Sequence, residues 1–328
     1  MRAVIVTAPG GPEMLQVAEV PEPHAGEGEV TVRVAAAGIN RADLLQRMGH
    51  YPPPPGASDI LGLEVSGVVA SVGAGVADIA EGDAVMALLE GGGYAELAAV
   101  RAHQVVQVPA NIDLIDAGGV PEVFITAHDA LFTRGRLQPG ETVLIHGGGG
   151  GVGTAAIQLG RQHGCRVLVT AGSAAKLARC AELGADAGIN YALDDFVMRT
   201  RELTDGRGAD VVLDIMGASY LGRNLEVVAT DGRVVVIGMQ GGTHADIDLG
   251  VMMRRRVSLI STALRARPAA QKAAIVGAFA SEVVPRLASA ALRPVIDRVL
   301  PFEAAGEAHR LMEAGEVVGK ILLVPAIP

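Results

Sequence analysis

Tryptophan is absent from this chain of 328 residues, and all aromatic residues together make up only 3% of it. Proteins that hold single-stranded nucleic acid stack its bases on aromatic side chains, so this composition argues against such a ligand. Basic clusters are scarce as well: the net charge is −9, and Arg254–Arg256 forms one short basic run. A run this short is typical of a solvated face or an interface, so we predict no nucleic-acid partner.

Cysteine occurs only twice, at Cys165 and Cys180. Their positions indicate neither a disulfide nor the spacing of metal ligands. Two such cysteines are consistent with a reducing, cytoplasmic location. Long apolar runs are also missing, since none approaches the roughly 20 residues of a membrane span. The apolar start Met1–Val6 meets Pro9 and Gly10, which is typical of a strand and not of a signal peptide. We predict no membrane partner.

Glycine is plentiful instead, and it is concentrated in Gly147–Gly153. The short apolar run Val143–Ile145 before these glycines predicts a strand that is buried on both faces. After them, apolar residues at the spacing of one helix face predict a helix that ends at Gly164. A second buried strand is predicted at 166–170. The whole stretch therefore indicates one βαβ unit.

Three of these glycines, Gly148, Gly150 and Gly153, satisfy the pattern G-x-G-x-x-G. One glycine allows a tight turn, one allows the backbone to approach a pyrophosphate, and one allows the helix to pack on the strand. The helix N-terminus offers free N–H groups to the phosphates. Because the pattern follows a strand and opens a helix, it predicts a dinucleotide-binding site.

The end of the second strand indicates which dinucleotide binds. NAD sites usually place Asp or Glu there to bind the ribose 2′-hydroxyl. This chain has Thr170–Ser173 instead, without a carboxylate that would repel a 2′-phosphate. Ser173 can donate a hydrogen bond, and Lys176 adds positive charge one turn later. We therefore predict NADP(H) as the cofactor.

Residues 1–120 indicate a β-rich domain, because Val30, Val32 and Val34 alternate with polar residues at the period of a half-buried strand. Further short strands and glycine turns suggest a small barrel or sandwich. The irregular segment 38–64 carries four consecutive prolines. It predicts a long, extended surface loop, a kind of loop that is usually functional or mobile.

Residues 121–259 alternate helix and strand patterns, which predicts a doubly wound parallel sheet of the α/β class. Ligands of such sheets bind beyond the strand C-termini, so we expect Gly217 and Gly238 near the cofactor. The pieces from Val257 onward, including a helix predicted over Ala270–Leu287, either extend this sheet or return to the first domain.

Short motifs along nearly the whole chain add a family resemblance. They are Gly38–Asp43, Tyr51-Pro52, Leu61–Glu64, Gly82-Asp83, Gly150–Gly153, Ala171–Ser173 with Lys176, Leu183–Ala185 and Gly319–Ile321. With these motifs the chain resembles the medium-chain dehydrogenase/reductase superfamily, and within it the zinc-free quinone oxidoreductases of the zeta-crystallin type. The run from Asn40 to Leu63 is most similar to the tumour-suppressor-inducible quinone oxidoreductases of animals.

This resemblance implies a GroES-like catalytic domain formed by residues 1–120 with 262–328. It also implies an NADP(H)-binding Rossmann domain over 121–261, and a homodimer or homotetramer. Zinc-dependent relatives carry Cys where this chain has Asn40 and His where it has Leu63. Without those ligands no catalytic zinc is expected, which disfavours alcohol oxidation and favours acceptors that take hydride unaided.

The resemblance also points to individual residues. Asn40 and Tyr51 are predicted to donate hydrogen bonds to the acceptor's carbonyl oxygen. Structural roles are the alternatives: Asn40 as the cap of a following helix, and Tyr51 packed against its own prolines. Further cofactor contacts are implied for Gly151, Val152, Gly172, Thr126, Tyr191 and Lys320.

The function predicted from these residues is reduction of a quinone by direct hydride transfer from NADPH. An enoyl or alkenal reductase, which reduces a conjugated C=C bond with the same fold and cofactor, is one alternative. A catalytically vestigial NADPH-binding protein is the other. The expected partner is a small-molecule quinone or enone.

Overall fold

The computed structural model describes residues 1–325 and divides the chain into two compact units. The first, here the split unit, contains Met1–Ile125 together with the described chain from Leu264 onward. The second, here the central unit, contains Thr126–Ala263. The first boundary between the units, at Ile125 and Thr126, falls within helix α2 (Pro121–His128). The second boundary lies between Ala263 and Leu264.

A seven-stranded sheet forms the body of the split unit. Its order is β14 (Ile296–Pro301), β15 (Lys320–Val324), β3 (Glu29–Gly38), β4 (Glu64–Val72), β5 (Ala84–Leu88) and β7 (Val105–Gln107), while β6 (Leu97–Arg101) also pairs with β3. Val30 and Val32 of β3 are fully buried, as the alternating pattern predicts. Since β15 pairs antiparallel with β3, the C-terminal strands belong to this sheet and not to the parallel one.

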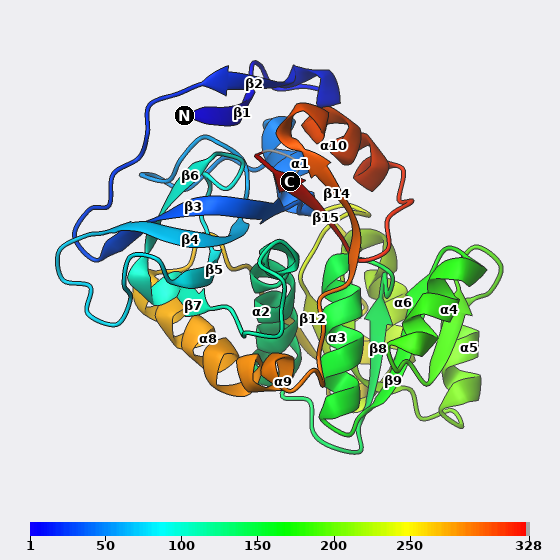
Figure 1. Cartoon of the computed structure of the whole chain (residues 1–328). Helices are drawn as coiled ribbons and strands as arrows, with labels where there is room; N and C mark the ends of the chain where they lie inside the picture. The colour runs from blue at the N-terminus through cyan, green and yellow to red at the C-terminus, as the bar shows by residue number, and fades with distance from the viewer. Residues whose placement is uncertain (326–328) are drawn as a thin grey trace. The chain divides into compact units, whose positions relative to one another are not determined.

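Short elements surround this sheet. The antiparallel pair β1 (Arg2–Val6) and β2 (Leu15–Glu19), blue in Figure 1, lies beside the orange helix α10 (Ala305–Glu313). Helix α1 (Arg41–Arg47) follows β3. The helix predicted over Ala270–Leu287 is confirmed with one interruption, since the stretch divides at Val283 into α8 (Ala269–Glu282) and α9 (Val284–Ala288). Pro285 has no N–H to continue the helical hydrogen bonds, so a new helix starts there.

The central unit holds a six-stranded sheet in which every pair of strands is parallel. Its order is β10 (Ala187–Asn190), β9 (Arg166–Ala171), β8 (Thr142–His146), β11 (Ala209–Asp214), β12 (Val228–Val236) and β13 (Ser258–Ser261). The predicted doubly wound sheet is confirmed. The strand expected from Val257 is present but short, and it extends this sheet.

Helices of the central unit connect these strands (Figure 1). They are α3 (Gly151–Gln162), α4 (Ala174–Glu182), α5 (Phe196–Leu203), α6 (Ala218–Val227) and α7 (Leu249–Arg255), with a π-helical segment at Asp129–Arg134. Strand order runs outward in both directions from the boundary between β8 and β11, which is where such sheets bind ligands. Throughout residues 1–325, no helix is long and apolar enough to cross a bilayer.

Candidate functional site

The glycine turn between β8 and α3 is shaped by close contacts that exclude side chains. Gly147 has φ of +69°, and the Gly148 N–H donates to the Thr170 carbonyl at 2.9 Å. A Cβ on Gly153 would lie 2.3 Å from the Gly147 oxygen, and one on Gly148 would lie 2.8 Å from Val169 Cβ. Larger residues cannot occupy these two positions without displacing backbone, so the turn is a cradle of bare main chain.

The N-terminus of α3 opens directly from this cradle. Gly150 is its N-cap, and Gly151, Val152 and Gly153 form its first turn. A Cβ on Gly150 would approach nothing nearer than 3.4 Å, so this glycine is not required by packing. Its lack of a side chain instead leaves room for a ligand to approach the free N–H groups of the helix.

Four predicted residues gather at the end of β9. Ser173 caps α4, with its hydroxyl accepting from the Lys176 N–H at 3.3 Å. The Lys176 side chain would lie 3.2 Å from a Cβ on Gly149, so its stem runs along the glycine turn. The Tyr191 hydroxyl would lie 2.6 Å from a Cβ on Gly172. The fold therefore brings Gly172, Ser173, Lys176 and Tyr191 together beside the glycine turn in the central unit.

The two glycines predicted beyond later strands also lie together. A Cβ on Gly217 would be 3.3 Å from the Gly238 oxygen, and one on Gly238 would be 2.8 Å from the Ile215 oxygen. Ile215 in turn reaches the first turn, since its Cδ1 would be 2.3 Å from a Cβ on Gly147. The carboxyl ends of β8, β11 and β12 thus converge. Thr126 is a half-buried residue within α2.

A buried polar cluster occupies the split unit, and Glu64 is at its centre. The Glu64 side chain is fully buried, and its carboxylate accepts from Lys320 Nζ at 2.8 Å and Asn40 Nδ2 at 3.0 Å. Its second oxygen accepts from the main-chain N–H of Glu122 at 2.9 Å. Four segments that are distant in the sequence are therefore joined by one carboxylate.

Asn40 and Lys320 direct their polar atoms into this cluster. Lys320 donates to Glu64, to Asn40 Oδ1 at 2.7 Å and to the Ile39 carbonyl, which uses all three of its N–H bonds. The Asn40 amide donates to Glu64 and to the Gly38 carbonyl at 3.2 Å. Asn40 is also the N-cap of α1, as the structural alternative predicted. Its contact with an acceptor, and that of Lys320 with a cofactor, stay predictions.

Asp43 ties together the two ends of the loop that carries Tyr51. Its carboxylate accepts from the Asn40 N–H at 2.7 Å, the Gly62 N–H at 3.2 Å and the Tyr94 hydroxyl at 3.0 Å. Complete burial raises the pKa of the Asp43 carboxyl to about 6, against the lowering effect of these donors.

Tyr51 is held from the side by Arg265. The Arg265 guanidinium lies 5.2 Å from the Tyr51 ring centre and donates to the Tyr51 carbonyl at 3.2 Å. It also donates to Gln46 Oε1 at 2.7 Å and to the Glu90 carbonyl at 2.7 Å. Within residues 1–325 the Tyr51 hydroxyl has no hydrogen-bond partner. Burial, and then the charge of Glu122, raise the pKa of the Tyr51 phenol, so it remains a neutral donor at neutral pH.

Glu122 completes the cluster from the first turn of α2. Burial first, and then the negative charge of Glu64, raise the pKa of the Glu122 carboxyl to about 8. Sequence reasoning missed Asp43, Glu122 and Arg265 as individual functional candidates. Asp43 lies in the motif Gly38–Asp43 but was given no role of its own, Glu122 and Arg265 lie in none of the motifs, and only folding shows that these charges converge.

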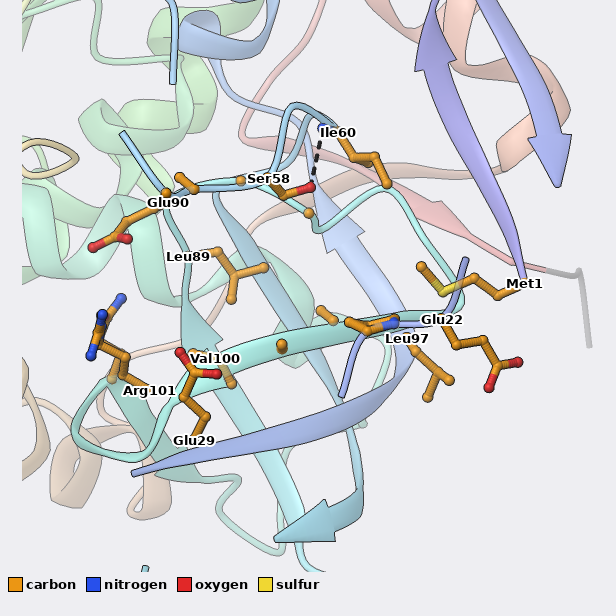
Figure 2. A pocket seen from close by; sticks show the side chains of 18 of the residues that line it. Met1, Glu22, Glu29, Ser58, Ile60, Leu89, Glu90, Leu97, Val100 and Arg101 are labelled. Atoms are coloured by element: carbon orange, nitrogen blue, oxygen red, sulfur yellow. Dashed lines mark hydrogen bonds between the residues drawn. The ribbon is translucent and has the colours of Figure 1, made fainter. Parts of the chain in front are cut away.

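A cavity of about 410 Å³ lies elsewhere in the split unit (Figure 2). Its wall includes Ser58, Glu90, Val100 and Arg101, and the Ser58 hydroxyl accepts from the Ile60 N–H at 3.2 Å. None of the predicted site residues lines it, so it is not the predicted acceptor site.

Two known domain families match the chain: the alcohol dehydrogenase GroES-like domain at residues 26–110, and the zinc-binding dehydrogenase domain at 151–278. The quinone oxidoreductase of Rattus norvegicus is 30% identical over 327 residues, which cover 99% of this chain and 98% of the rat protein. The chain belongs to the medium-chain dehydrogenase/reductase family, in its zeta-crystallin-type branch. The GroES-like and Rossmann folds predicted from the sequence are confirmed.

Other relatives of the family are equally extensive matches. The human synaptic vesicle membrane protein VAT-1 homolog is 33% identical over 343 residues, covering 99% of this chain and 86% of that protein. The solved structure of Escherichia coli quinone oxidoreductase complexed with NADPH is 30% identical. It has a TM-score of 0.88, with 99% of this chain and 100% of that chain covered. A mycobacterial protein complexed with NADPH is also 30% identical, with a TM-score of 0.90 and the same coverage.

Members of this family are oxidoreductases that bind NADP(H). The cradle that Gly148 and Gly153 leave open fits the pyrophosphate of such a cofactor. As for metals, residues 1–325 contain no group of three or more His, Cys, Asp or Glu residues placed to hold an ion. Zinc independence stays a prediction.

Proposed function

We propose that the chain reduces quinones by direct hydride transfer from NADPH, without a metal. The observation that carries this proposal is the Tyr51 hydroxyl. It has no partner among the described residues, while Arg265 holds the Tyr51 main chain and lies beside its ring. A neutral phenol held in this way can donate a hydrogen bond to an acceptor's carbonyl oxygen and stabilise the negative charge that develops there.

NADPH is assigned to the central unit. The pyrophosphate is proposed to bind the glycine turn, with Gly151 and Val152 presenting N–H groups at the start of α3. The 2′-phosphate is proposed to lie near Ser173, Lys176 and Tyr191, which surround Gly172 without a carboxylate among them. Thr126, Gly217, Gly238 and Lys320 complete the proposed cofactor contacts. When bound, the reduced nicotinamide supplies a hydride, that is, two electrons with one proton.

The protein's own part in the reaction is positioning and electrostatics. Tyr51 is proposed to orient the acceptor oxygen, with the buried guanidinium of Arg265 adding positive charge to that region. Asn40 is proposed to act from the same cluster. Its amide is engaged with Glu64 and Lys320, so we assign it chiefly the task of fixing the geometry around the loop.

Reduction of a conjugated C=C bond is the second candidate. One solved neighbour is the JamJ enoyl reductase, which is 27% identical with a TM-score of 0.88 and coverage of 98% of both chains. A reaction of that class needs an acid to protonate carbon, and the Tyr51 hydroxyl has no hydrogen-bond partner in the part of the chain that the structure describes. A catalytically vestigial NADPH-binding protein is the third candidate.

The experiment follows NADPH oxidation by purified protein through loss of the reduced-nicotinamide absorbance. A simple ortho-quinone and an α,β-unsaturated ketone serve as parallel acceptors. Faster turnover with the quinone supports the proposed function, whereas faster turnover with the enone assigns the chain to the enoyl reductases. Tight NADPH binding with no oxidation by either acceptor would assign a binding role without catalysis.

A cytoplasmic homo-oligomer is part of this proposal. Cys165 and Cys180 are buried and unpaired, which fits a reducing compartment. Leu249 and Met253 of α7, a helix that packs against β12, are 66% and 79% exposed. Apolar exposure of this kind suits an interface between copies, which light scattering during size-exclusion chromatography would reveal as a dimer or tetramer mass.

A further inference from the structure

Hydride transfer to a quinone leaves an oxygen anion that still needs a proton. The following inference rests on the proposed function and concerns the source of that proton. Three carboxyl groups meet in the polar cluster of the split unit: Asp43, Glu64 and Glu122. Their hydrogen-bond partners differ, and these partners show which of the three carboxyl groups is structural and which could take part in proton transfer.

Asp43 and Glu64 are both fully buried and saturated by donors. Asp43 accepts three hydrogen bonds, and Glu64 accepts from Lys320, Asn40 and the Glu122 main chain. A carboxylate satisfied in this way has its oxygens committed to its donors and is shut off from a substrate. Neither group can deliver a proton without dismantling the cluster.

The Glu122 carboxyl is placed differently. Its main-chain N–H is pinned to Glu64 at 2.9 Å, which fixes the first turn of α2. Its side chain, however, is only partly buried, and within residues 1–325 its carboxyl makes no hydrogen bond or ion pair. A carboxyl without a partner, mounted on a fixed helix and reachable from solvent, can exchange its proton with a ligand and then with water.

Four charged groups of the split unit act on the pKa of Glu122. Glu64 on β4 and Asp43 on α1 disfavour its ionised form, while Lys320 on β15 and Arg265 favour it. Burial is the largest influence, and the pKa of about 8 leaves Glu122 protonated at neutral pH. The same charges connect it to the proposed acceptor site, because Glu122 and Arg265 both act on the Tyr51 phenol.

We propose that Glu122 is the proton donor of the reaction, acting on an acceptor oxygen that Tyr51 and Arg265 hold beside it. When bound, the reduced cofactor would supply the hydride that converts the quinone into a hydroquinone anion, and would itself be left oxidised. The O–H bond of the Glu122 carboxyl then breaks, and the proton forms the new O–H bond of the hydroquinone. Glu122 regains a proton from water, so one quinone, one NADPH and one proton are consumed in total.

The test compares Glu122→Gln with the wild-type protein from pH 6 to pH 10. Glutamine keeps the size of the side chain but has no acidic proton, so kcat with the quinone should fall about 100-fold at pH 7. We expect the kcat of the wild type to fall above about pH 8, and this fall should be absent in the variant. The NADPH dissociation constant should stay within about twofold, since Glu122 is not assigned to the cofactor.

Asp116→Asn is the matched control. Asp116 is a second partly buried carboxyl of the split unit with a raised pKa, caused by burial and by Asp113, and it takes no part in the cluster. This variant should retain wild-type turnover and pH dependence. Glu122→Asp, which keeps an acidic proton on a shorter side chain, should retain more turnover than Glu122→Gln. If Glu122→Gln does not fold, the comparison of Glu122→Asp with the wild type decides, because a shorter acid must shift the alkaline limb of kcat.

A readout without turnover uses the protein in the absence of cofactor. Infrared difference spectra should show a protonated carboxyl band that titrates near pH 8 in the wild type and is missing in Glu122→Gln. Wild-type kcat and pH dependence in Glu122→Gln, or an unchanged carboxyl band, would overturn the proton donor while leaving the quinone reductase intact. If the wild-type protein fails to oxidise NADPH with every acceptor offered, the proposed function itself would instead be overturned.

Discussion

The ammonium of Lys320 lies 2.8 Å from the carboxylate of Glu64, and both side chains are almost completely buried. The two residues come from β15 and β4, near opposite ends of the chain. Asn40 and the Ile39 carbonyl occupy the remaining donors of Lys320. Because burial of charge is costly, such a pair persists only when its geometry and hydrogen bonds are nearly complete. The pair therefore closes the split unit around its C-terminal strand.

Replacing one partner of this pair should be severely destabilising. We expect Lys320→Met to lower the free energy of unfolding by roughly 3–5 kcal/mol, because Glu64 would be left as a buried charge without a counterion. Urea unfolding followed by circular dichroism measures this. The control is Arg298→Met, which removes a partly exposed pair with Asp297 and should cost less than about 1 kcal/mol. Equal losses in the two variants would contradict the importance of burial.

Tyr51→Phe tests the proposed acceptor contact directly. Loss of the hydroxyl should lower kcat with a quinone by about 10–100-fold, because one donor to the developing oxygen anion is removed. The NADPH dissociation constant should change less than twofold. Asn40→Ala should lower both turnover and thermal stability, since Lys320 and Glu64 each lose a partner. Unchanged turnover in both variants would remove the two residues from the mechanism.

Two glycines of the turn should respond differently to alanine. Gly153→Ala forces a Cβ to within 2.3 Å of the Gly147 oxygen, so we expect a loss of about 1–3 kcal/mol of stability together with weaker NADPH binding. Gly150→Ala meets nothing within 3.4 Å and should keep its melting temperature while still weakening NADPH binding. Differential scanning calorimetry measures the loss of stability, and titration with NADPH measures the loss of cofactor binding. Gly222→Ala on α6 serves as the control. Identical behaviour of the two turn variants would argue against separate roles.

Lys176→Glu tests the 2′-phosphate assignment. Reversing this charge should raise the Michaelis constant for NADPH by about tenfold or more, which corresponds to about 1.4 kcal/mol, and should raise that for NADH much less. Arg179→Glu, on the exposed face of α4 beside Glu182, should leave the ratio of the two constants unchanged. If Lys176→Glu changed both constants equally, the assignment would be wrong.

The Glu122 carboxyl makes stability depend on pH in a direction opposite to that of most carboxylates. Its pKa of about 8 in the folded protein lies above the roughly 4.3 of an unfolded chain. Between these values only the unfolded chain ionises, so the folded protein loses up to about 5 kcal/mol of stability as pH rises to 8. Unfolding curves of wild type and Glu122→Gln should coincide near pH 4 and separate by pH 8, with the variant the more stable. Curves that stay parallel over this range would show that the pKa is not raised.

Local patterns predicted the central unit well. The apolar run of β8, the glycine turn and the periodicity of α3 are contiguous, so short-range sterics decide them, and the predicted parallel sheet followed. Not every element was predicted: helices α6 and α7 and the π-helical segment Asp129–Arg134 were missed. The helix predicted over Ala270–Leu287 is divided at Val283, just before Pro285, because the apolar pattern continues past a residue that has no N–H to donate.

The sequence by itself determined the βαβ unit, the open glycine cradle and the absence of a carboxylate after β9, since each depends on neighbouring residues. It also carried the motifs by which the family was identified. Only the tertiary structure decided that Asn40, Glu64, Glu122 and Lys320 form one polar cluster, and that Arg265 lies against Tyr51. These contacts join segments that are far apart in the sequence. Whether two such charged residues pair depends on the order of the strands and on how deeply the residues are buried. Neither property can be read from the residues next to them in the sequence.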